Sequence, residues 1–268
     1  MSGTAFLLND RGVVRVSGPE AADFLQGLLT NDVLGLEGDA ARYAGLLSPQ
    51  GKVLFDFLVV RVAGDEPTFL LDCLGTQVAE LAKRLGFYKL RSKVVIADVS
   101  SEFAVLAGFG DAPDLPNAFV DPREAQLGWR AIAPKDSVAK LTIEADVSAY
   151  EINRIALGVP RGGVDFAYGD AIVHEANFDR LHGVDFKKGC YVGQEIVSRV
   201  EHRGTARKRV TRVVFDGPAP APGTEVFAAD IIIGTVGSSA GAQGLAMLRL
   251  DKVEGADLKA GGVGVKLV

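Results

Sequence analysis

The chain has little cysteine and no long apolar run, and each absence argues against a class of protein. Only two of its 268 residues are cysteines, Cys73 and Cys190. Cys73 ends an apolar run and Cys190 lies between glycines in a polar segment, so we expect no structural disulfide and a reducing compartment. No apolar run approaches the roughly 18–20 residues that span a bilayer.

Other absences narrow the class further. Residues 1–10 lack the basic and apolar regions of a secretory signal. We therefore expect a cytoplasmic protein, or one of the mitochondrial matrix if the source is eukaryotic. The formal net charge of −5 gives no overall reason to expect nucleic acid as a partner. Without a membrane-spanning run, no membrane is expected as a partner either. Nucleotide-binding folds lose support because the chain has no GxGxxG or Walker-type loop.

The first two-thirds of the chain mixes helices with hairpin-linked strands, which favours an α+β fold over a doubly wound parallel sheet. Capping residues and helical spacing of apolar residues predict helices that start near residues 20, 75 and 146. Residues 111–122 hold three of the eleven prolines and are predicted to form a surface loop. The predicted strands cover residues 41–47, 53–62, 68–73, 93–99 and 103–108.

From residue 208 onward the pattern changes to short β-rich runs separated by glycine and proline turns. These runs cover residues 208–215, 225–227, 231–237, 244–250 and 264–268. Several short strands at close spacing are typical of a small barrel or sandwich. A module of about sixty residues has a small core, so we expect it to dock on the rest of the chain.

The segment around Cys190 predicts an accessible thiol. Gly189 and Gly193 let the backbone turn tightly, and residues 193–202 have a composition compatible with a helix. Cys190 would then precede a helix N-terminus, where free amide groups and the helix dipole favour negative charge. Lys187 and Lys188 add positive potential, a setting that makes a thiolate accessible. A buried, inert cysteine is the alternative, and it is the weaker one here.

Charged residues after Cys190 leave alternatives open. Glu195, Arg199 and His202 share one helix face, which is ordinarily a solvated ion-pair stripe. The basic residues at 203, 207–209 and 212 form either a solvated hinge or a site for an anionic tail, such as the carboxylates of a glutamyl group. The three histidines around Cys190 match no zinc-binding spacing, so we predict no metal ligands.

Several blocks along the chain carry a family resemblance. The most specific is Lys188-Gly189-Cys190-Tyr191-Val192-Gly193-Gln194-Glu195, followed by Arg199, Gly204 and Lys208-Arg209. These residues resemble the YgfZ family of folate-binding proteins, which includes mitochondrial iron–sulfur assembly factors and is related to the glycine-cleavage T-protein, an aminomethyltransferase. Less specific blocks match at residues 24–33, 48–56, 90–94, 154–160 and 175–177.

The resemblance implies a fold and a function. The fold would be a T-protein-like folate-binding α+β region over residues 1–205, as one body or two subdomains, and a C-terminal β-barrel over residues 206–268. The cofactor would be tetrahydrofolate or a derivative. The role would be assembly or repair of [4Fe–4S] proteins, with iron–sulfur client or assembly proteins as partners and Cys190 as the functional thiol.

Carboxylate, amide and guanidinium side chains in these blocks are the candidate folate ligands, because they can bond the polar edges of a pterin or its acidic tail. Asn31 and Asp32 are equally able to cap the end of the first helix. The candidates are Asn31, Asp32, Asp56, Arg154, Glu175, Asn177, Gln194, Glu195 and Arg199.

Departures from the T-protein pattern argue against aminomethyl transfer. Ala156 stands where T-proteins have a carboxylate, and Phe55-Asp56 stands where they have two acids. Neither alanine nor phenylalanine can accept or relay a proton. Whether the chain is an enzyme therefore stays open. If it is one, we expect a folate-dependent one-carbon (aminomethyl) transferase that uses Asp56, and a non-catalytic folate-binding scaffold is the third alternative.

Overall fold

A computed structural model describes residues 4–38, 40–139, 141–204 and 206–268, and the chain divides into two units. The first unit comprises Met1–Leu47, Leu54–Tyr150 and His182–Val192. The second unit comprises Ser48–Val53, Glu151–Leu181 and Gly193–Val268. Each unit is therefore assembled from segments that are distant in sequence.

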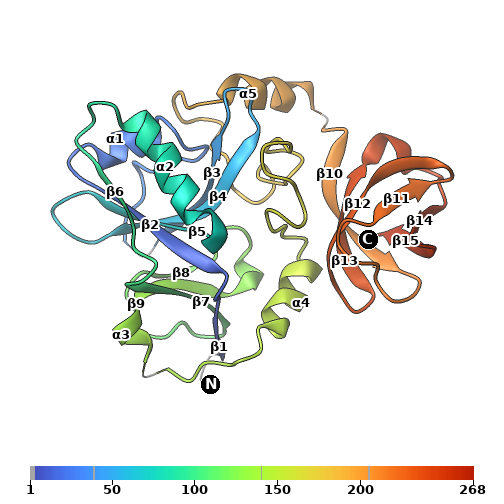
Figure 1. The fold of residues 1–268 in the computed structure, drawn as a ribbon, viewed down its shortest axis with the longest axis horizontal. Coiled ribbons are helices and arrows are strands. Elements are labelled where there is room, and N and C mark those ends of the chain that lie inside the picture. The colour runs from blue at the N-terminus through green and yellow to red at the C-terminus, as the bar shows by residue number, and fades with distance from the viewer. Residues whose placement is uncertain (1–3, 39, 140, 205) are drawn as a thin grey trace. The chain divides into compact units, whose positions relative to one another are not determined.

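A five-stranded antiparallel sheet forms the centre of the first unit, and its apolar residues alternate between the two faces. Phe57, Val59 and Leu71 point to the face that α1 (Ala21–Gln26) and α2 (Val78–Lys89) cover (Figure 1). A short 3-10 turn, η1 (Gly75–Gln77), leads into α2. The sheet order is β3-β4-β5-β2-β6, with bounds β2 (Arg11–Ser17), β3 (Ala41–Leu47), β4 (Val53–Val62), β5 (Thr68–Leu74) and β6 (Val95–Asp98).

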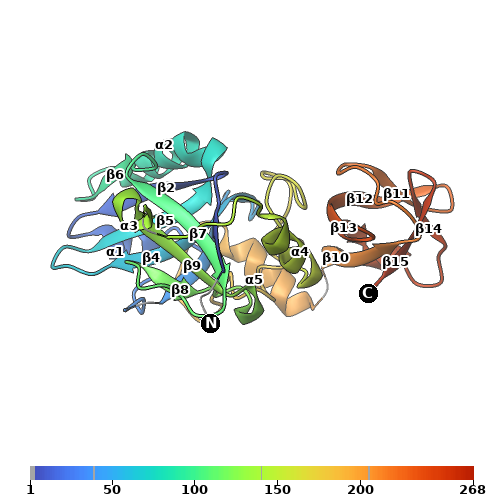
Figure 2. The same ribbon diagram turned by 90° about the horizontal axis from the view of Figure 1, so that it is seen from below.

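A second antiparallel sheet of the first unit packs on the other face of the central sheet, where Arg130 of this sheet reaches Asp72 of β5 (Figure 2). Its outer face carries a small apolar core that includes Trp129 and Val138, the latter on α3 (Lys135–Val138). The turn η2 (Ala125–Leu127) precedes its third strand. The order is β1-β7-β9-β8, with bounds β1 (Thr4–Leu7), β7 (Phe103–Phe109), β8 (Ala118–Val120) and β9 (Trp129–Pro134).

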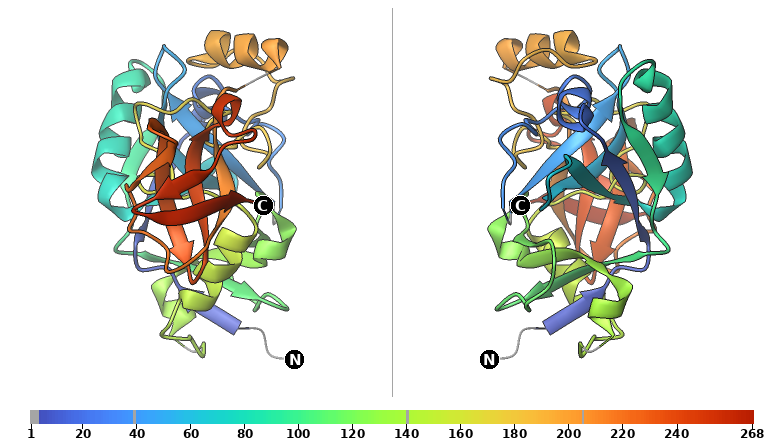
Figure 3. Two further views of the ribbon diagram at one scale, coloured as in Figure 1. Left: turned by 90° about the vertical axis from the view of Figure 1, so that its right-hand side faces the viewer. Right: turned by 90° about the vertical axis from the view of Figure 1, so that its left-hand side faces the viewer.

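The second unit contains helix α5 (Gln194–Arg203), most of helix α4 (Ser148–Ala156) and a closed β-barrel. Closure pairs the first strand with the last, so the barrel has no open sheet edge. Its core includes Val213, Val226 and Leu248. Figure 3 shows the barrel in orange and red. Its strand order is β10-β13-β12-β11-β14-β15, and the turn η3 (Leu250–Lys252) lies between β13 and β14 in the sequence. The bounds are β10 (Lys208–Phe215), β11 (Glu225–Ala228), β12 (Ile231–Ala240), β13 (Gln243–Arg249), β14 (Leu258–Ala260) and β15 (Val263–Leu267).

The predicted α+β class and the C-terminal barrel are confirmed. Strands β3, β4 and β10 lie at the residues that the sequence pattern predicts. The predicted surface loop over residues 111–122 is wrong at its centre, because residues 118–120 pair with β9 despite the nearby prolines. The domain boundary at residue 205 stays a prediction. No helix in the described part of the chain is long and apolar enough to cross a membrane.

Candidate functional site

Cys190 is exposed, whereas two side chains close to it in the sequence are buried. Lys188 and Tyr191 on either side are 9% and 8% exposed. The other cysteine, Cys73, is fully buried in β5, and burial raises the pKa of its thiol to about 12. Cys190 is therefore the thiol that a partner can reach, as the sequence predicts.

Lys188 anchors the cysteine segment to the end of α1. Its Nζ donates hydrogen bonds to the carbonyl oxygens of Gln26, Leu29 and Asn31, at 2.8, 2.6 and 2.9 Å. A cation suits the carbonyl of Gln26 because it is the last residue of α1, where carbonyls have no partner within the helix. The other two carbonyls lie in the turn that follows. Burial lowers the pKa of Lys188 to about 8, so the ammonium is still mostly protonated at neutral pH.

This role of Lys188 corrects part of the sequence interpretation. The sequence suggests that Lys187 and Lys188 both supply positive potential beside the thiol. The ammonium of Lys188 instead bonds three carbonyls and lies 5.3 Å from the centre of the Tyr191 ring. Lys187 is the exposed lysine of the two. The main contribution of Lys188 is thus to hold the loop.

Further hydrogen bonds hold the residues just before Lys188. Asp185 accepts hydrogen bonds from the amides of Lys187 and Lys188, and its own amide donates to the carbonyl of Thr30. The Thr30 hydroxyl donates to the carbonyl of Gly183 at 2.6 Å. The N-terminal block and the cysteine block of the sequence therefore meet in the first unit. Cys190 is therefore presented directly after a segment that these hydrogen bonds fix in place.

Helix α5 begins at Gln194, shortly after Cys190 in the sequence, as predicted. Gly193 precedes it with a φ of 83°, a conformation that glycine adopts without strain. The block at residues 48–52 packs against the start of α5, since a Cβ on Gly51 would lie only 2.8 Å from the Cβ of Ile196. Glu195 and Arg199 form an exposed pair at 2.9 Å, which is the solvated stripe of the ordinary interpretation.

Asp56 lies on the face of β4 that points toward the second sheet, and it is 6% exposed. The hydroxyl of Tyr43 donates a hydrogen bond to its carboxylate at 3.1 Å. The guanidinium of Arg123 lies 5.7 Å from the centre of the Tyr43 ring. A buried carboxylate in such a polar setting is a suitable acceptor for the N–H groups of a ligand.

Two groups of buried, paired charges lie near Asp56 and Tyr43, and the predictions from the sequence did not include them. Asp72 accepts hydrogen bonds from Arg11 and Arg130, both at 2.6 Å. Asp121 pairs with Arg123 at 2.7 Å. Burial acts to raise the pKa of Asp121, but the Arg123 guanidinium outweighs it and lowers this pKa. The available signal was Asp72 itself, a lone acid in the apolar strand β5, because a buried charge requires a partner.

Two other candidates of the first unit make contacts within the protein. The amide of Asn31 donates to the carbonyls of Tyr43 and His182. The carboxylate of Asp32 accepts from the amide of Gly35 and from the side chain of Gln26. Partial burial acts to raise the pKa of Asp32, but these hydrogen bonds lower it. Asp32 therefore organises the turn after α1, and Asn31 ties that turn to β3 and to His182. Folate binding by either residue stays a prediction.

The remaining candidates lie in the second unit, and three of them connect its segments. Arg154 is buried, pairs with Glu151 and Asp165, and donates to the hydroxyl of Ser238. Asn177 donates to the carbonyl of Val210 and accepts from Arg209. Glu175 accepts from the amide of Ile172. Gln194, Glu195 and Arg199 lie on α5. Folate binding by these residues stays a prediction, and the first three also have a role in the fold.

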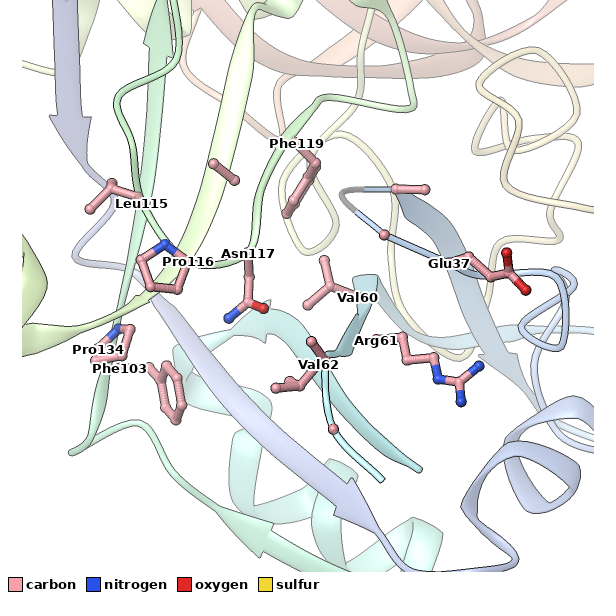
Figure 4. Close-up of a pocket in the computed structure, with 15 residues that line it drawn as sticks. Glu37, Val60, Arg61, Val62, Phe103, Leu115, Pro116, Asn117, Phe119 and Pro134 are labelled. Carbon is pink, nitrogen blue, oxygen red and sulfur yellow. The ribbon is translucent and has the colours of Figure 1, made fainter. Parts of the chain in front are cut away.

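A cavity of about 690 Å³ opens between the two sheets of the first unit. Figure 4 shows Val60, Val62, Phe103 and Phe119 around it, with Arg61 at one end (Figure 4). Neither Asp56 nor Cys190 lines this cavity. Its lining is mainly apolar, so it offers little for acid–base chemistry. Within the described residues, no group of three or more His, Cys, Asp or Glu side chains is placed to hold a metal ion.

Two parts of the chain match known families. Residues 8–115 match the GCVT N-terminal domain, and residues 207–268 match the CAF17 C-terminal beta-barrel domain. The aminomethyltransferase T of the glycine cleavage system from Bartonella henselae superposes with a TM-score of 0.78 over 99% of this chain and 84% of its own. The sequences are 17% identical, so this likeness shows the fold.

Curated relatives are more similar in sequence. The iron-sulfur cluster assembly factor IBA57, mitochondrial, of Mus musculus is 34% identical over 284 residues, covering 94% of this chain and 79% of that protein. The IBA57 homolog of Mycosarcoma maydis is 34% identical over 223 residues, which are 76% of this chain and 55% of that protein. The chain thus spans about half the length of the fungal relative. Both relatives are named mitochondrial, in agreement with the expectation for a eukaryotic source.

Proposed function

The chain belongs to the family of the IBA57 iron–sulfur cluster assembly factors, on a T-protein-like fold, and from this membership we propose that it binds tetrahydrofolate or a derivative and assists assembly or repair of [4Fe–4S] proteins. IBA57 thereby replaces YgfZ as the specific family that the cysteine block indicates. The observation that carries the proposal is the exposed thiol of Cys190 between the buried side chains of Lys188 and Tyr191.

An exposed thiol on an ordered loop can contact an iron–sulfur cluster that another protein delivers. Thiolate sulfur is the usual ligand of such clusters, and a single cysteine cannot hold one alone. A client or assembly protein must then supply the other ligands. Because the loop is already ordered by Lys188 and Asp185, little conformational entropy is lost when the partner docks. Transient ligation, redox exchange and reaction with a folate-derived one-carbon unit all use the thiol in this position.

The folate part of the proposal rests on the fold and on Asp56. Its buried carboxylate, next to the Tyr43 hydroxyl, fits the amide and amino N–H groups of a pterin edge. When bound, a tetrahydrofolate would supply a reduced pterin and a carrier of one-carbon units. Asp56 and Tyr43 would orient the ring, and burial would strengthen their hydrogen bonds by excluding water.

Aminomethyl transfer is the second candidate function, and Asp56 on a T-protein-like fold is the observation that favours it. Two features of the chain oppose it. Phe55 packs into the apolar core on the helix side of the sheet, so it leaves Asp56 as the one acid of this pair. Ala156 ends α4 and offers only its carbonyl, which accepts a hydrogen bond from Arg212. We therefore place transfer second.

Titration of tetrahydrofolate into the natural chain and its variants tests the folate proposal. Asp56→Asn is expected to weaken binding by about tenfold or more, since a hydrogen bond to a charged group contributes about 1.5–3 kcal/mol. Cys190→Ser and the exposed control Asp65→Asn are expected to bind as the natural chain does. If no tetrahydrofolate species binds the natural chain, the folate proposal fails. Turnover of an aminomethyl donor that Asp56→Asn abolishes would instead favour the transferase.

A further inference from the structure

The outer face of α2 carries an exposed stripe that neither the fold nor the proposed function uses. The inner face of this helix is buried through Val78, Leu81 and Leu85. Lys83 and Phe87 lie one turn apart on the exposed side of the helix. Leu90 and Arg91, just past its C-terminus, are also exposed, whereas Arg84 is half-buried. We call residues 83–93 the α2 basic segment.

Two large apolar side chains protrude from the α2 basic segment. Phe87 is 62% exposed and Leu90 is 89% exposed. Leu90 also has a φ of 44°, a conformation that is uncommon for a residue with a side chain. The chain therefore places a leucine in water, at a backbone position that a glycine would occupy with less strain.

The charged residues of the segment itself are all basic, and one acid from elsewhere, Glu20, accepts a hydrogen bond from the amide of Lys93 at its end. Lys83, Arg84, Lys89, Arg91 and Lys93 are basic, and no acidic residue occurs from residue 81 to residue 97, in a chain whose net charge is −5. Lys83 has an i,i+3 contact with Glu80 at 3.7 Å. The other four make no ion pair with any residue in the described ranges. Favourable interaction with the helix dipole accounts for basic residues in the last turn, but not for those at 83 and 84 or for the exposed apolar side chains.

We propose that the α2 basic segment is a docking surface for a bilayer that contains anionic lipid. Lysine and arginine side chains would contact the headgroups, and Phe87 and Leu90 would enter the boundary between headgroups and acyl chains. This is peripheral binding by one helix face. It needs no membrane-spanning run, and it revises the expectation from the sequence that no membrane is a partner.

The geometry favours a bilayer over an acidic protein as the occupant. The two apolar side chains stand out from the helix surface and its C-terminal turn, with 62% and 89% of their surface exposed. A protein partner would need a preformed socket that matches both side chains, whereas a bilayer accepts protruding apolar groups anywhere on its surface. Charges of a single sign likewise match a surface that is uniformly negative.

Co-sedimentation with lipid vesicles tests the proposal. The natural chain is expected to sediment with phosphatidylcholine vesicles that contain about one-third phosphatidylglycerol, and not with phosphatidylcholine alone. Binding is expected to fall as salt is raised. Arg91→Glu/Lys93→Glu is expected to weaken binding by about tenfold or more, because each basic residue near an anionic surface contributes about 1 kcal/mol. Phe87→Ser/Leu90→Ser is expected to weaken it as well.

Matched variants on the barrel serve as controls. Lys259→Glu/Lys266→Glu makes the same charge change at exposed lysines, and Ile231→Ser/Ile232→Ser removes exposed apolar side chains. Both are expected to bind vesicles as the natural chain does. Absence of binding to anionic vesicles, equal binding to neutral ones, or equal losses in the barrel variants would overturn the proposal. Loss in the charge variant with full binding in Phe87→Ser/Leu90→Ser would overturn the insertion of these two side chains, because the bilayer would then be bound by charge alone.

Discussion

Lys188→Met is expected to destabilise the first unit and to release the loop that carries Cys190. The variant leaves the carbonyls of Gln26, Leu29 and Asn31 without their shared donor. A buried polar group that loses its partner costs about 1–3 kcal/mol, so three carbonyls predict a loss of about 3 kcal/mol or more in the free energy of unfolding. Methionine keeps the length of the side chain, so this loss reports the ammonium group.

Urea denaturation and amide hydrogen exchange measure this effect. Exchange in residues 182–192 is expected to accelerate more than exchange in the barrel strands. Lys187→Met is the matched control, because Lys187 is the next residue and is exposed. Similar stability and similar exchange in the two variants would mean that Lys188 does not anchor the loop.

Asp72→Ala is expected to cause the largest loss of stability of any single change considered. Its carboxylate is fully buried and accepts from Arg11 and Arg130, which are themselves largely buried. Removing one partner of a buried ion pair leaves uncompensated charge and costs about 3–5 kcal/mol. Here two guanidinium groups lose their carboxylate together, so we expect a loss at the upper end of that range.

Thermal and urea unfolding check the prediction for Asp72. Asp65→Ala is the matched control, since Asp65 lies on the exposed turn between β4 and β5. It is expected to change stability by less than about 0.5 kcal/mol, as surface substitutions usually do. If Asp72→Ala is as stable as Asp65→Ala, the buried charges between the two sheets do not support the fold.

Local sequence pattern was enough to predict the strands that have a long apolar run or clear flanking turns. Strand β4 has a continuous apolar run, and β10 to β13 are separated by glycine and proline turns, so their positions follow from the sequence. Strands β1, β2, β8, β9 and β14 escaped prediction, and two of them have weak patterns. β8 is three residues long, and β9 contains Arg130 and ends at Pro134. Their pairing with each other and with β7 is a tertiary effect that outweighs local propensity.

The candidate site also combines features that the sequence predicts with features that it does not. An accessible Cys190 before a helix follows from glycines, lysines and helix signals in one short segment. The anchoring role of Lys188 does not, because its three acceptors lie about 160 residues earlier in the chain. The contact between Tyr43 and Asp56 likewise joins two strands, and no pattern within either strand indicates it. Long-range pairs of polar atoms were the information that the sequence pattern lacked.

The central claim is that the thiol of Cys190 is the working group of this chain, and the activity of a [4Fe–4S] client enzyme in cells tests it most directly. Cells that carry Cys190→Ser are expected to lose client activity by about tenfold or more, the loss typical when groups that support a metal site are removed. Cells that carry Cys73→Ala, the control for the buried thiol, are expected to keep it. Full client activity with Cys190→Ser, at equal protein level, would contradict the account.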